Sequence, residues 1–383
     1  MNIMFVGLSG VPYLGRACDS RLTNIVNILA EENEVEIINR YSSLKKKTLE
    51  GLGLSDNVHL HEMIKRRMTG RKISFILLVL SVFVEFSFLI NRRRKGKIHY
   101  LHLYSGHYVD FLFYFVVSRI IGAKVVYEYV EYRLGKNYGN NLYHKVNNFL
   151  VDKYGARLWD SCFAISNFLI RRANEVNPYL PIIKVTPLCD FSYFDDCNDT
   201  IDIEENYVMF CGSAAYFDIV KLIIDSYNQS RIHKEMKLLL VLSGSDIQLE
   251  RICQYSDNCI IKSKVSYPKL IAYYKRAFAL LIPLRDTVED IARFPNKICE
   301  YSAAKGLIVT TKFGEIPYYF EDGVNAVVAE DFGVLELSNK LNKIIDGSYS
   351  LQQIKSNCYK TGKESFDIFV YKDRLTRFLK EKL

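Results

Sequence analysis

A turn, a short helix and a buried strand follow one another between residues 293 and 310, RFPNKICEYSAAKGLIVT, and this order constrains the fold. Pro295 fixes φ at a value suited to the start of a helix and needs no amide partner there. The residues up to Ala304 fit a short helix, for which Gly306 is expected to supply the left-handed stop. Residues 307–310 are apolar and β-branched, which is typical of an inner strand of an α/β sheet.

Lys297 and Glu300 stand three residues apart in the expected helix, so both side chains project from the same face. A lysine at the positive end of a helix does not stabilise the helix. Both residues make sense if the ammonium and the helix N-terminus bind a diphosphate while the carboxylate accepts hydrogen bonds from hydroxyls. By spacing alone, a surface helix with an incidental lysine and glutamate is the simpler interpretation.

The sequence that follows favours the functional interpretation. A glycine loop, Gly314-Glu315-Ile316, comes after the buried strand, and residues 322–326 read DGVNA. The segment resembles the donor half of GT-B glycosyltransferases, in particular the large retaining family numbered four, whose pattern is Pro-x-Lys-x-x-Glu-Tyr-x-Ala-x-Gly, a strand, Gly-Gly-x-x-Glu and Asp-Gly-x-Asn-Gly. The resemblance follows the segment order over nearly the whole chain and is specific between Leu281 and Val328.

The resemblance implies an α/β fold of the GT-B type, with two Rossmann-like domains facing a central cleft. Residues 1–195 are expected to form the acceptor domain and residues 206–365 the nucleotide-sugar donor domain. The acidic stretch between them is the expected linker. By the same resemblance, residues 366–383 form a last helix that crosses back to the first domain.

Composition excludes several other classes of protein. The chain has 383 residues, of which 49% are hydrophobic and 25% charged, which is enough for two globular cores. Nine cysteines without a Cys-x-x-Cys pair indicate free thiols in a reducing compartment, and no histidine spacing suggests a metal site. The N-terminus lacks the basic region and the long apolar run of a signal peptide, so a cytoplasmic protein is expected.

The net charge of +8 is concentrated around one apolar run, residues 73–90. Subtracting ten flanking cations leaves −2 for the rest, and no module that interleaves basic and aromatic residues indicates nucleic-acid binding. These cations are Lys65, Arg66, Arg67, Arg71, Lys72, Arg92, Arg93, Arg94, Lys95 and Lys97.

The run itself is just long enough to cross a bilayer, but crossing would divide one sheet between two sides of the membrane, so we reject a spanning helix. Ser74, Ser81 and Glu85 fall on one narrow stripe of a helix. The helix is either buried against the sheet or partly exposed at the inner leaflet, with residues 65–97 on anionic lipid. We favour the membrane contact over a merely solvated basic face.

Candidate residues in the first domain lie in two loops. Gly7, Ser9 and Gly10 follow the first expected strand and lie at the acceptor side of the cleft in the resembling family, although a plain strand–helix turn explains them nearly as well. The family often carries a histidine near the transferred sugar, where this chain has residues 128–131, EYVE. His107 is the nearest substitute, and a lone loop histidine is more often merely solvated.

The donor-site candidates depart from the family pattern at several positions. Gly212-Ser213 stands where the family has Gly-Arg, which leaves Lys297 and Arg285 as the expected diphosphate cations. The first acid of the family's Glu-x7-Glu falls on Ala292, so Glu289 or Asp290 is expected to reach the sugar. Among the remaining donor-binding candidates, Glu300 is expected to bind the ribose hydroxyls, and Lys264 and Val265 the base. The others are Asn296, Gly212, Ser213 and Gly314.

The expected function is transfer of a sugar, with retention, from a nucleoside-diphosphate sugar to a hydroxyl, without a metal or other cofactor. The expected acceptor is a lipid-linked saccharide or oligosaccharide of bacterial surface polysaccharide synthesis, reached at the inner face of the plasma membrane. Two alternatives stay open. One is a sugar-nucleotide 2-epimerase, and the other is an inactive partner of another transferase, because Ser213, Val130 and Ala292 depart from the pattern.

Overall fold

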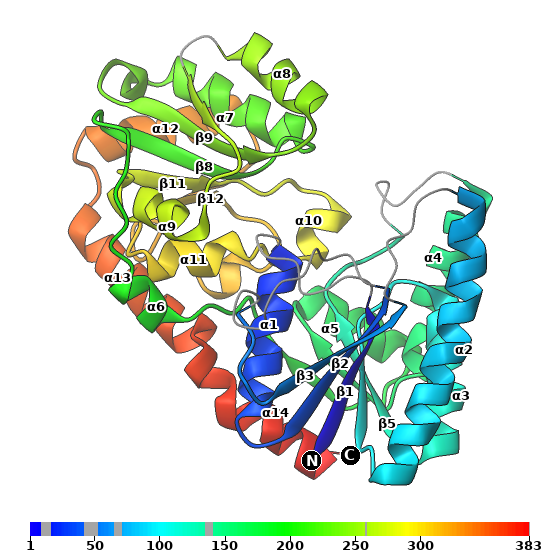
Figure 1. Ribbon diagram of the computed structural model, residues 1–383. Coiled ribbons are helices and arrows are strands. Elements are labelled where there is room, and N and C mark those ends of the chain that lie inside the picture. The colour runs from blue at the N-terminus through cyan, green and yellow to red at the C-terminus, as the bar shows by residue number, and fades with distance from the viewer. Residues whose placement is uncertain (9–16, 42–52, 65–70, 135–140, 257–258, 383) are drawn as a thin grey trace. The chain divides into compact units, whose positions relative to one another are not determined.

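A computed structural model describes residues 1–8, 17–41, 53–64, 71–134, 141–256 and 259–382 of the chain (Figure 1). They form two compact units, unit 1 with residues Met1–Thr186 and Ile368–Leu383 and unit 2 with residues Pro187–Asp367. The chain first passes between the units at Thr186, before the acidic stretch that composition indicated as the linker. Each unit is a parallel sheet with helices on both faces, so the prediction of two Rossmann-like α/β domains is confirmed.

Unit 1 contains a seven-stranded sheet in the order β3-β2-β1-β4-β5-β6-β7, in which every paired strand is parallel. Its strands are β1 (Asn2–Leu8), β2 (Glu34–Tyr41), β3 (Val58–Ile64), β4 (Tyr100–Leu103), β5 (Lys124–Tyr129), β6 (Ser161–Ala164) and β7 (Ile182–Lys184). Its helices are α1 (Ala17–Ala30), α2 (Arg71–Lys95), α3 (Tyr108–Ile121), α4 (Leu142–Tyr154), α5 (Asn167–Val176) and α14 (Ile368–Lys382). Helices α1 and α14 pack together on one face of this sheet, and α2 and α3 lie on the other (Figure 1).

The C-terminal helix is anchored within unit 1. The Tyr100 hydroxyl donates to the carbonyl oxygen of Leu379 over 2.7 Å, and the hydroxyls of Tyr371 and Thr186 are 2.8 Å apart. Leu375 and Leu379 are fully buried. The helix expected over residues 366–383 is present as α14, which begins at Ile368, after α13 has ended at Phe366.

The core of unit 1 contains the single tryptophan of the chain, Trp159. Its ring stacks on Tyr127 with centroids 4.1 Å apart and meets Phe111 and Tyr129 edge-on at 5.5 Å each. The indole is 5% exposed, so this aromatic group belongs to the packed interior.

Unit 2 contains a six-stranded parallel sheet in the order β10-β9-β8-β11-β12-β13. Its strands are β8 (Tyr207–Ser213), β9 (Lys237–Ser243), β10 (Cys259–Lys262), β11 (Ala279–Ile282), β12 (Ile308–Thr311) and β13 (Val327–Ala329). Its helices are α6 (Phe191–Asp196), α7 (Phe217–Gln229), α8 (Asp246–Tyr255), α9 (Tyr267–Arg276), α10 (Val288–Ala292), α11 (Lys297–Ala303), α12 (Val334–Ile345) and α13 (Leu351–Phe366). Helices α7 and α12 pack side by side over an apolar core that also includes the inner strands.

The helix and strand expected at residues 297–310 are present as α11 and β12, but the expected helix stop is wrong. Lys305, with φ 58°, takes the left-handed conformation, and Gly306 does not. Gly306 serves close packing instead, because a Cβ there would lie 2.2 Å from Leu280 Cδ1. No helix among the described residues, α2 included, is long and apolar enough to cross a membrane.

Candidate functional site

The carboxyl edge of the unit 2 sheet has a switch point between β8 and β11. These neighbouring strands pair in parallel, with Phe210 opposite Leu281. From β8 the chain continues outward to β9 and β10, whereas from β11 it continues in the other direction to β12 and β13. The loops after β8 and β11 therefore diverge, and ligands of open α/β sheets bind in the crevice that such loops leave.

Lys297 and Glu300 lie beside this switch point on the first turn of α11. The Lys297 ammonium donates to Glu300 Oε2 over 2.6 Å, and the Tyr274 hydroxyl donates to the same oxygen over 3.1 Å. The Lys297 side chain is 23% exposed and that of Glu300 is 5% exposed. Burial disfavours the Lys297 charge, but the attraction of Glu300 outweighs it and raises the pKa of Lys297 above its usual range. Lys297 therefore stays charged at neutral pH.

Helix α11 is fixed to the end of β8 by one specific contact. The backbone N–H of Cys211 donates to the Tyr301 hydroxyl over 3.1 Å, and the Tyr301 ring meets Tyr274 edge-on. Burial raises the pKa of the Cys211 thiol, and the nearby charge of Lys297 acts in the opposite direction. The ammonium thus lies close to the carboxyl end of β8.

A second charged cluster joins the loops after β8 and β11. Arg285 donates to Asp290 through Nε and Nη2 over 2.9 and 3.0 Å, and through Nη1 to Asp218 over 2.7 Å. Arg293 forms an ion pair with Asp290 and donates to the Tyr216 hydroxyl over 2.7 Å. Both guanidinium groups lie over the Tyr216 ring. These contacts hold the two diverging loops together at the switch point.

The structure places Asp290 within this cluster, fully buried. Burial acts to raise the pKa of Asp290, but the hydrogen bonds with Arg285 and the charge of Arg293 outweigh it and hold that pKa below its usual range. Its carboxylate bridges two arginines, an arrangement that positions them. Of the two acids expected to reach the sugar, Asp290 is thus held between arginines, and Glu289 on the same short helix stays the candidate for that contact.

Arg293, Tyr216 and Asp218 were not expected at the site. The Glu-x7-Glu count drew attention to Ala292, which is buried, rather than to the arginine beside it. The sequence did contain one indication that Arg293 lies near the site, because this residue directly precedes the Phe-Pro-Asn-Lys segment that carries Lys297.

The other donor-binding candidates lie at the same edge of the sheet at different distances from the switch point. A Cβ on Gly212 would lie 2.6 Å from the Phe210 ring, and one on Gly314, whose φ is 63°, would lie 3.0 Å from the Asp290 carbonyl oxygen. Ser213 ends β8, and its hydroxyl accepts from the Ala215 N–H over 3.2 Å. Asn296 directly precedes α11. Lys264, with φ 55°, and Val265 follow β10, two strands from β8.

The unit 1 candidates lie at the carboxyl edge of its own sheet. Gly7 has φ 78°, and its N–H donates to the Tyr114 hydroxyl over 2.9 Å. His107 precedes α3 and its Nδ1 is 3.2 Å from the Tyr143 hydroxyl. Burial lowers the pKa of His107, against an opposite effect of Asp110. Ser9 and Gly10 lie outside the described residues.

Next to Gly7 lies a buried polar network that was not predicted. Arg40 pairs with Glu85 over 2.9 Å and with Asp110 over 2.7 Å, and the Tyr114 hydroxyl donates to Glu85 over 2.5 Å. Burial raises the pKa of Glu85, while the charge of Arg40 acts against it. Ser81 and Glu85 of the polar stripe thus face the interior, where Glu85 is the partner of an arginine on β2.

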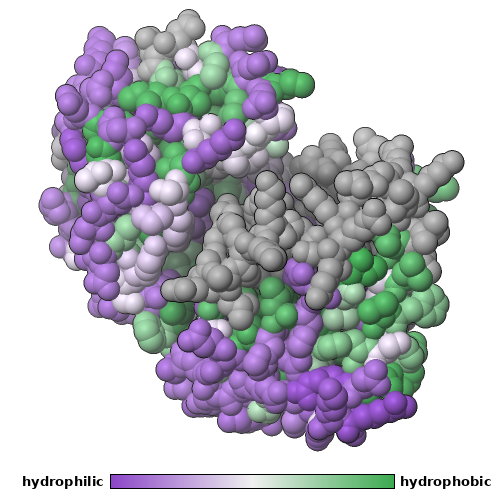
Figure 2. Space-filling view, in the orientation of Figure 1, coloured by the Kyte–Doolittle hydropathy of each residue, from purple (hydrophilic) through white to green (hydrophobic). Residues whose placement is uncertain are grey.

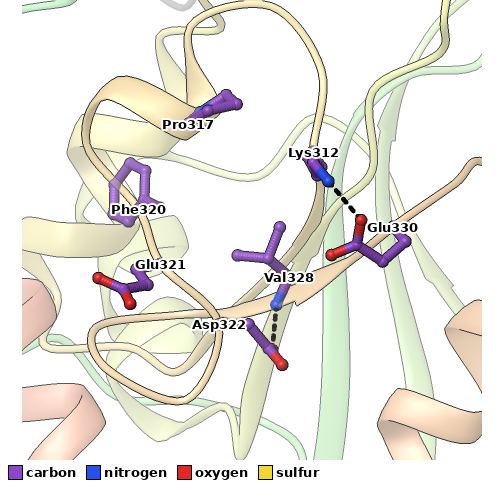
Figure 3. Close-up of a pocket in the computed structure, with 7 residues that line it drawn as sticks. All are labelled: Lys312, Pro317, Phe320, Glu321, Asp322, Val328 and Glu330. Atoms are coloured by element: carbon purple, nitrogen blue, oxygen red, sulfur yellow. Dashed lines mark hydrogen bonds and ion pairs between the residues drawn. The ribbon is translucent and has the colours of Figure 1, made fainter.

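A pocket of about 420 Å³ lies away from the switch point, between the end of β12 and strand β13 (Figure 3). Three of its four charged lining residues are paired with other side chains. Lys312 bonds Glu330 over 2.5 Å, and Asp322 accepts from the Val328 N–H over 2.8 Å and pairs with Lys340 over 2.7 Å. Within the described part of the chain, no group of three or more His, Cys, Asp or Glu side chains could hold a metal ion.

Comparison with known proteins places this site in context. Residues 205–346 match the family model described as "Glycosyl transferases group 1". No curated protein matches the chain. Among solved structures, sucrose-phosphate synthase from Thermosynechococcus elongatus is similar with a TM-score of 0.78 at 12% identity, over 99% of this chain and 98% of that one.

Two further structures show the same architecture. Anabaena HepE in complex with UDP and glucose has a TM-score of 0.72 at 14% identity, with 99% of each chain covered. WaaB, a lipopolysaccharide outer core galactosyltransferase, has a TM-score of 0.67 at 15% identity, with 100% of each chain covered. The chain has the GT-B fold of glycosyltransferases, and its residues 205–346 match glycosyl transferases group 1.

Proposed function

We propose that the protein is a retaining, metal-independent glycosyltransferase that moves a sugar from a nucleoside-diphosphate sugar to a saccharide hydroxyl. The observation that carries this proposal is the Lys297–Glu300 pair beside the switch point of unit 2. It combines a permanently charged ammonium with a carboxylate in the part of the chain that matches glycosyl transferases group 1. The HepE structure that contains UDP and glucose has the same fold, which supports a nucleotide-sugar donor.

The chemistry that follows from this geometry is stabilisation of a leaving group. Cleavage of the bond from sugar to phosphate builds negative charge on the β-phosphate, and a cation already in place lowers the barrier. Lys297 supplies that charge, and Arg285 supports it. Glu300 accepts hydrogen bonds from the ribose hydroxyls, and Glu289 contacts the sugar. The attacking hydroxyl passes its proton to the leaving phosphate, so no dedicated nucleophile is needed.

The acceptor in this proposal is a lipid-linked saccharide of bacterial surface polysaccharide synthesis. The exposed cations Arg93, Arg94, Lys95 and Lys97 support a site at the inner face of the plasma membrane, because such residues are attracted to anionic lipid. The likeness to WaaB agrees with a surface saccharide as the product. The protein is then cytoplasmic and peripherally bound.

A thermal-shift screen with UDP, GDP, dTDP, ADP and CMP, without added metal and with a chelator present, tests the donor site. A selective rise in Tm is expected with one nucleotide, because a ligand that binds only the folded state must stabilise it. The corresponding nucleotide sugars are then incubated with the protein and the products separated. Transfer or hydrolysis supports the enzyme, interconversion of two nucleotide sugars indicates the epimerase, and no rise with any nucleotide overturns the proposal in favour of the inactive partner.

A further inference from the structure

Helix α4 exposes more apolar side chains than a surface helix in water, which turns its apolar stripe to the core. Its buried residues are Asn147, Asn148 and Val151, and Asn147 Nδ2 donates to the Gly106 carbonyl oxygen over 2.9 Å. Leu142, Tyr143, Val146 and Phe149 are each about half exposed or more, with two exposed lysines of the same helix, Lys145 and Lys153, beside them.

Helix α3 is apolar on both sides. Its buried residues include Phe111, Val117 and Ile121 as well as Asp110 and Ser118, and yet Val109, Leu112, Val116 and Ile120 are exposed. These four side chains are spaced three, four and four residues apart, so they form one continuous stripe along the outer side of the helix. Arg119 is the one charged residue among the exposed side chains of α3.

In helix α2, Ser81 and Glu85 are completely buried while Leu80, Phe83 and Val84 are exposed. The buried carboxylates of Glu85 and Asp110 both pair with Arg40, so these polar groups are satisfied inside the protein. The three helices bury part of their apolar surface and leave a second, apolar part exposed.

The exposed side chains of the three helices form one surface, which we call the outer helical face. Helix α3 contacts both α2 and α4. Figure 2 shows hydrophobic side chains gathered on the side of unit 1 where Figure 1 places α2 and α3. The face consists of Leu80, Phe83, Val84, Val109, Leu112, Val116, Ile120, Leu142, Tyr143, Val146 and Phe149.

One end of the outer helical face is strongly basic. Arg93 Nε donates to the Ile121 carbonyl oxygen over 2.8 Å, so the C-terminal ends of α2 and α3 meet. Exposed cations gather there: Arg93, Arg94, Lys95, Lys97 and Arg119. The only acidic residues of α2, α3 and α4 are Glu85, Asp110 and Asp152, and their carboxylates are paired with arginines. A second copy of this surface would bring like charges together, whereas an anionic bilayer complements both its apolar and its basic part.

We propose that the outer helical face lies in the interface of an anionic bilayer, with its apolar side chains at the boundary of headgroups and acyl chains and the basic end on lipid phosphates. This inference rests on the membrane association proposed above. It moves the main contact from residues 65–97 to a surface of three helices, of which α3 and α4 supply most of the apolar side chains. Tyr143 links the face to His107, so the headgroup of a lipid-linked acceptor would meet the carboxyl edge of the unit 1 sheet.

Vesicle flotation of the full chain tests this inference, with vesicles of phosphatidylcholine alone and of phosphatidylcholine with about one third phosphatidylglycerol. Two double variants remove apolar contacts without altering the charge of the face or touching the basic end: Leu112→Gln with Val116→Gln, and Val146→Gln with Phe149→Gln. Each is expected to lower partitioning onto anionic vesicles by about tenfold or more, because apolar burial supplies much of the binding. The matched controls are Ile247→Gln and Leu335→Gln, at two exposed apolar residues of unit 2, and they are expected to bind as the parent does.

The outcomes separate this inference from the proposals on which it rests. If the α3 and α4 variants bind anionic vesicles as well as the parent does, the three-helix contact is overturned, but the association through residues 65–97 is kept. Absence of binding for the parent chain overturns both. A dimer in light scattering that the same variants dissociate would identify a second copy as the occupant and overturn the bilayer. Nucleotide binding is measured without lipid, so a failure of the glycosyltransferase proposal is detected in a separate experiment. An unchanged Tm of the variants shows that they are folded.

Discussion

Replacement of Lys297 by Met tests the donor site most directly, provided that structural and functional effects are separated. The ammonium has two roles in the structure, because it is the partner of the Glu300 carboxylate at 2.6 Å and the cation assigned to the leaving phosphate. A single substitution removes both. The double variant Lys297→Met with Glu300→Gln removes the ion pair as a unit, and Glu300→Gln alone is its reference, because Glu300 is itself assigned to the ribose hydroxyls.

The stability cost follows from the burial of the two side chains. Glu300 is 5% exposed, so Lys297→Met leaves an almost buried carboxylate with the Tyr274 hydroxyl at 3.1 Å. Breaking a buried ion pair costs about 3–5 kcal/mol, and since Lys297 is 23% exposed we expect about 2–3 kcal/mol. The double variant carries no orphaned charge, and its free energy of unfolding is expected to recover to within about 1 kcal/mol of the parent.

The binding cost is expected to follow a different pattern. A hydrogen bond from a charged donor to phosphate contributes about 2 kcal/mol, which is some thirtyfold in Kd. Lys297→Met should lose this amount relative to the parent, and the double variant should lose it relative to Glu300→Gln, because neither has the ammonium. Urea unfolding followed by circular dichroism measures the stability, and titration calorimetry with the nucleotide selected in the screen measures the Kd.

The informative result is the combination of the two measurements on the double variant. Recovered stability with nucleotide binding about thirtyfold weaker than that of Glu300→Gln supports Lys297 as a donor-site cation. Recovered stability together with the Kd of Glu300→Gln would refute the reasoning, since Lys297 would then serve only to neutralise Glu300.

Three further predictions concern unit 2. The pKa of Asp290 is depressed in the folded state, so its contribution to stability is present above its unfolded pKa of about 3.9 and is lost as the pH falls through the folded value. Asp290→Asn should therefore flatten the decrease of the urea unfolding midpoint below about pH 4, and an unchanged pH profile would contradict this. Gly362→Ala should cost about 1–3 kcal/mol, because a Cβ there would lie 2.4 Å from Ser302 Cβ, and an unaltered Tm would show that α13 can shift. Asp218→Asn removes the negative charge of the half-exposed partner of Arg285 and should therefore tighten nucleoside-diphosphate binding by about two- to fivefold at low salt. Titration calorimetry should find this effect reduced at high salt.

The α/β architecture could be predicted from the sequence because its signals are local. Residues 297–310 combine a helix start with a β-branched run, and both elements formed as α11 and β12. The stop between them was predicted wrongly because Gly306 is needed for its small size against Leu280, a contact with another strand that no local rule contains. Lys305 takes the left-handed turn in its place.

The candidate site was only partly accessible from sequence. The Lys297–Glu300 pair follows from helix spacing, but the partners of Arg285 do not. Asp218 is 67 residues away along the chain, so tertiary structure brings it to the guanidinium group, and Asp290 is five residues away across a turn whose path the sequence does not specify. Helical periodicity likewise found the polar stripe of α2 but not its direction, which depends on Arg40 of β2.

The position of Trp159 makes the two units optically distinguishable. The chain has one tryptophan, and it is packed in the core of unit 1. With excitation near the red edge of the tyrosine absorption, the emission of the chain therefore reports unit 1 alone, whereas calorimetry reports the heat absorbed by both units. Coincident transitions in the two signals would indicate that the units unfold together, and separate transitions would assign the fluorescent one to unit 1 without any labelling.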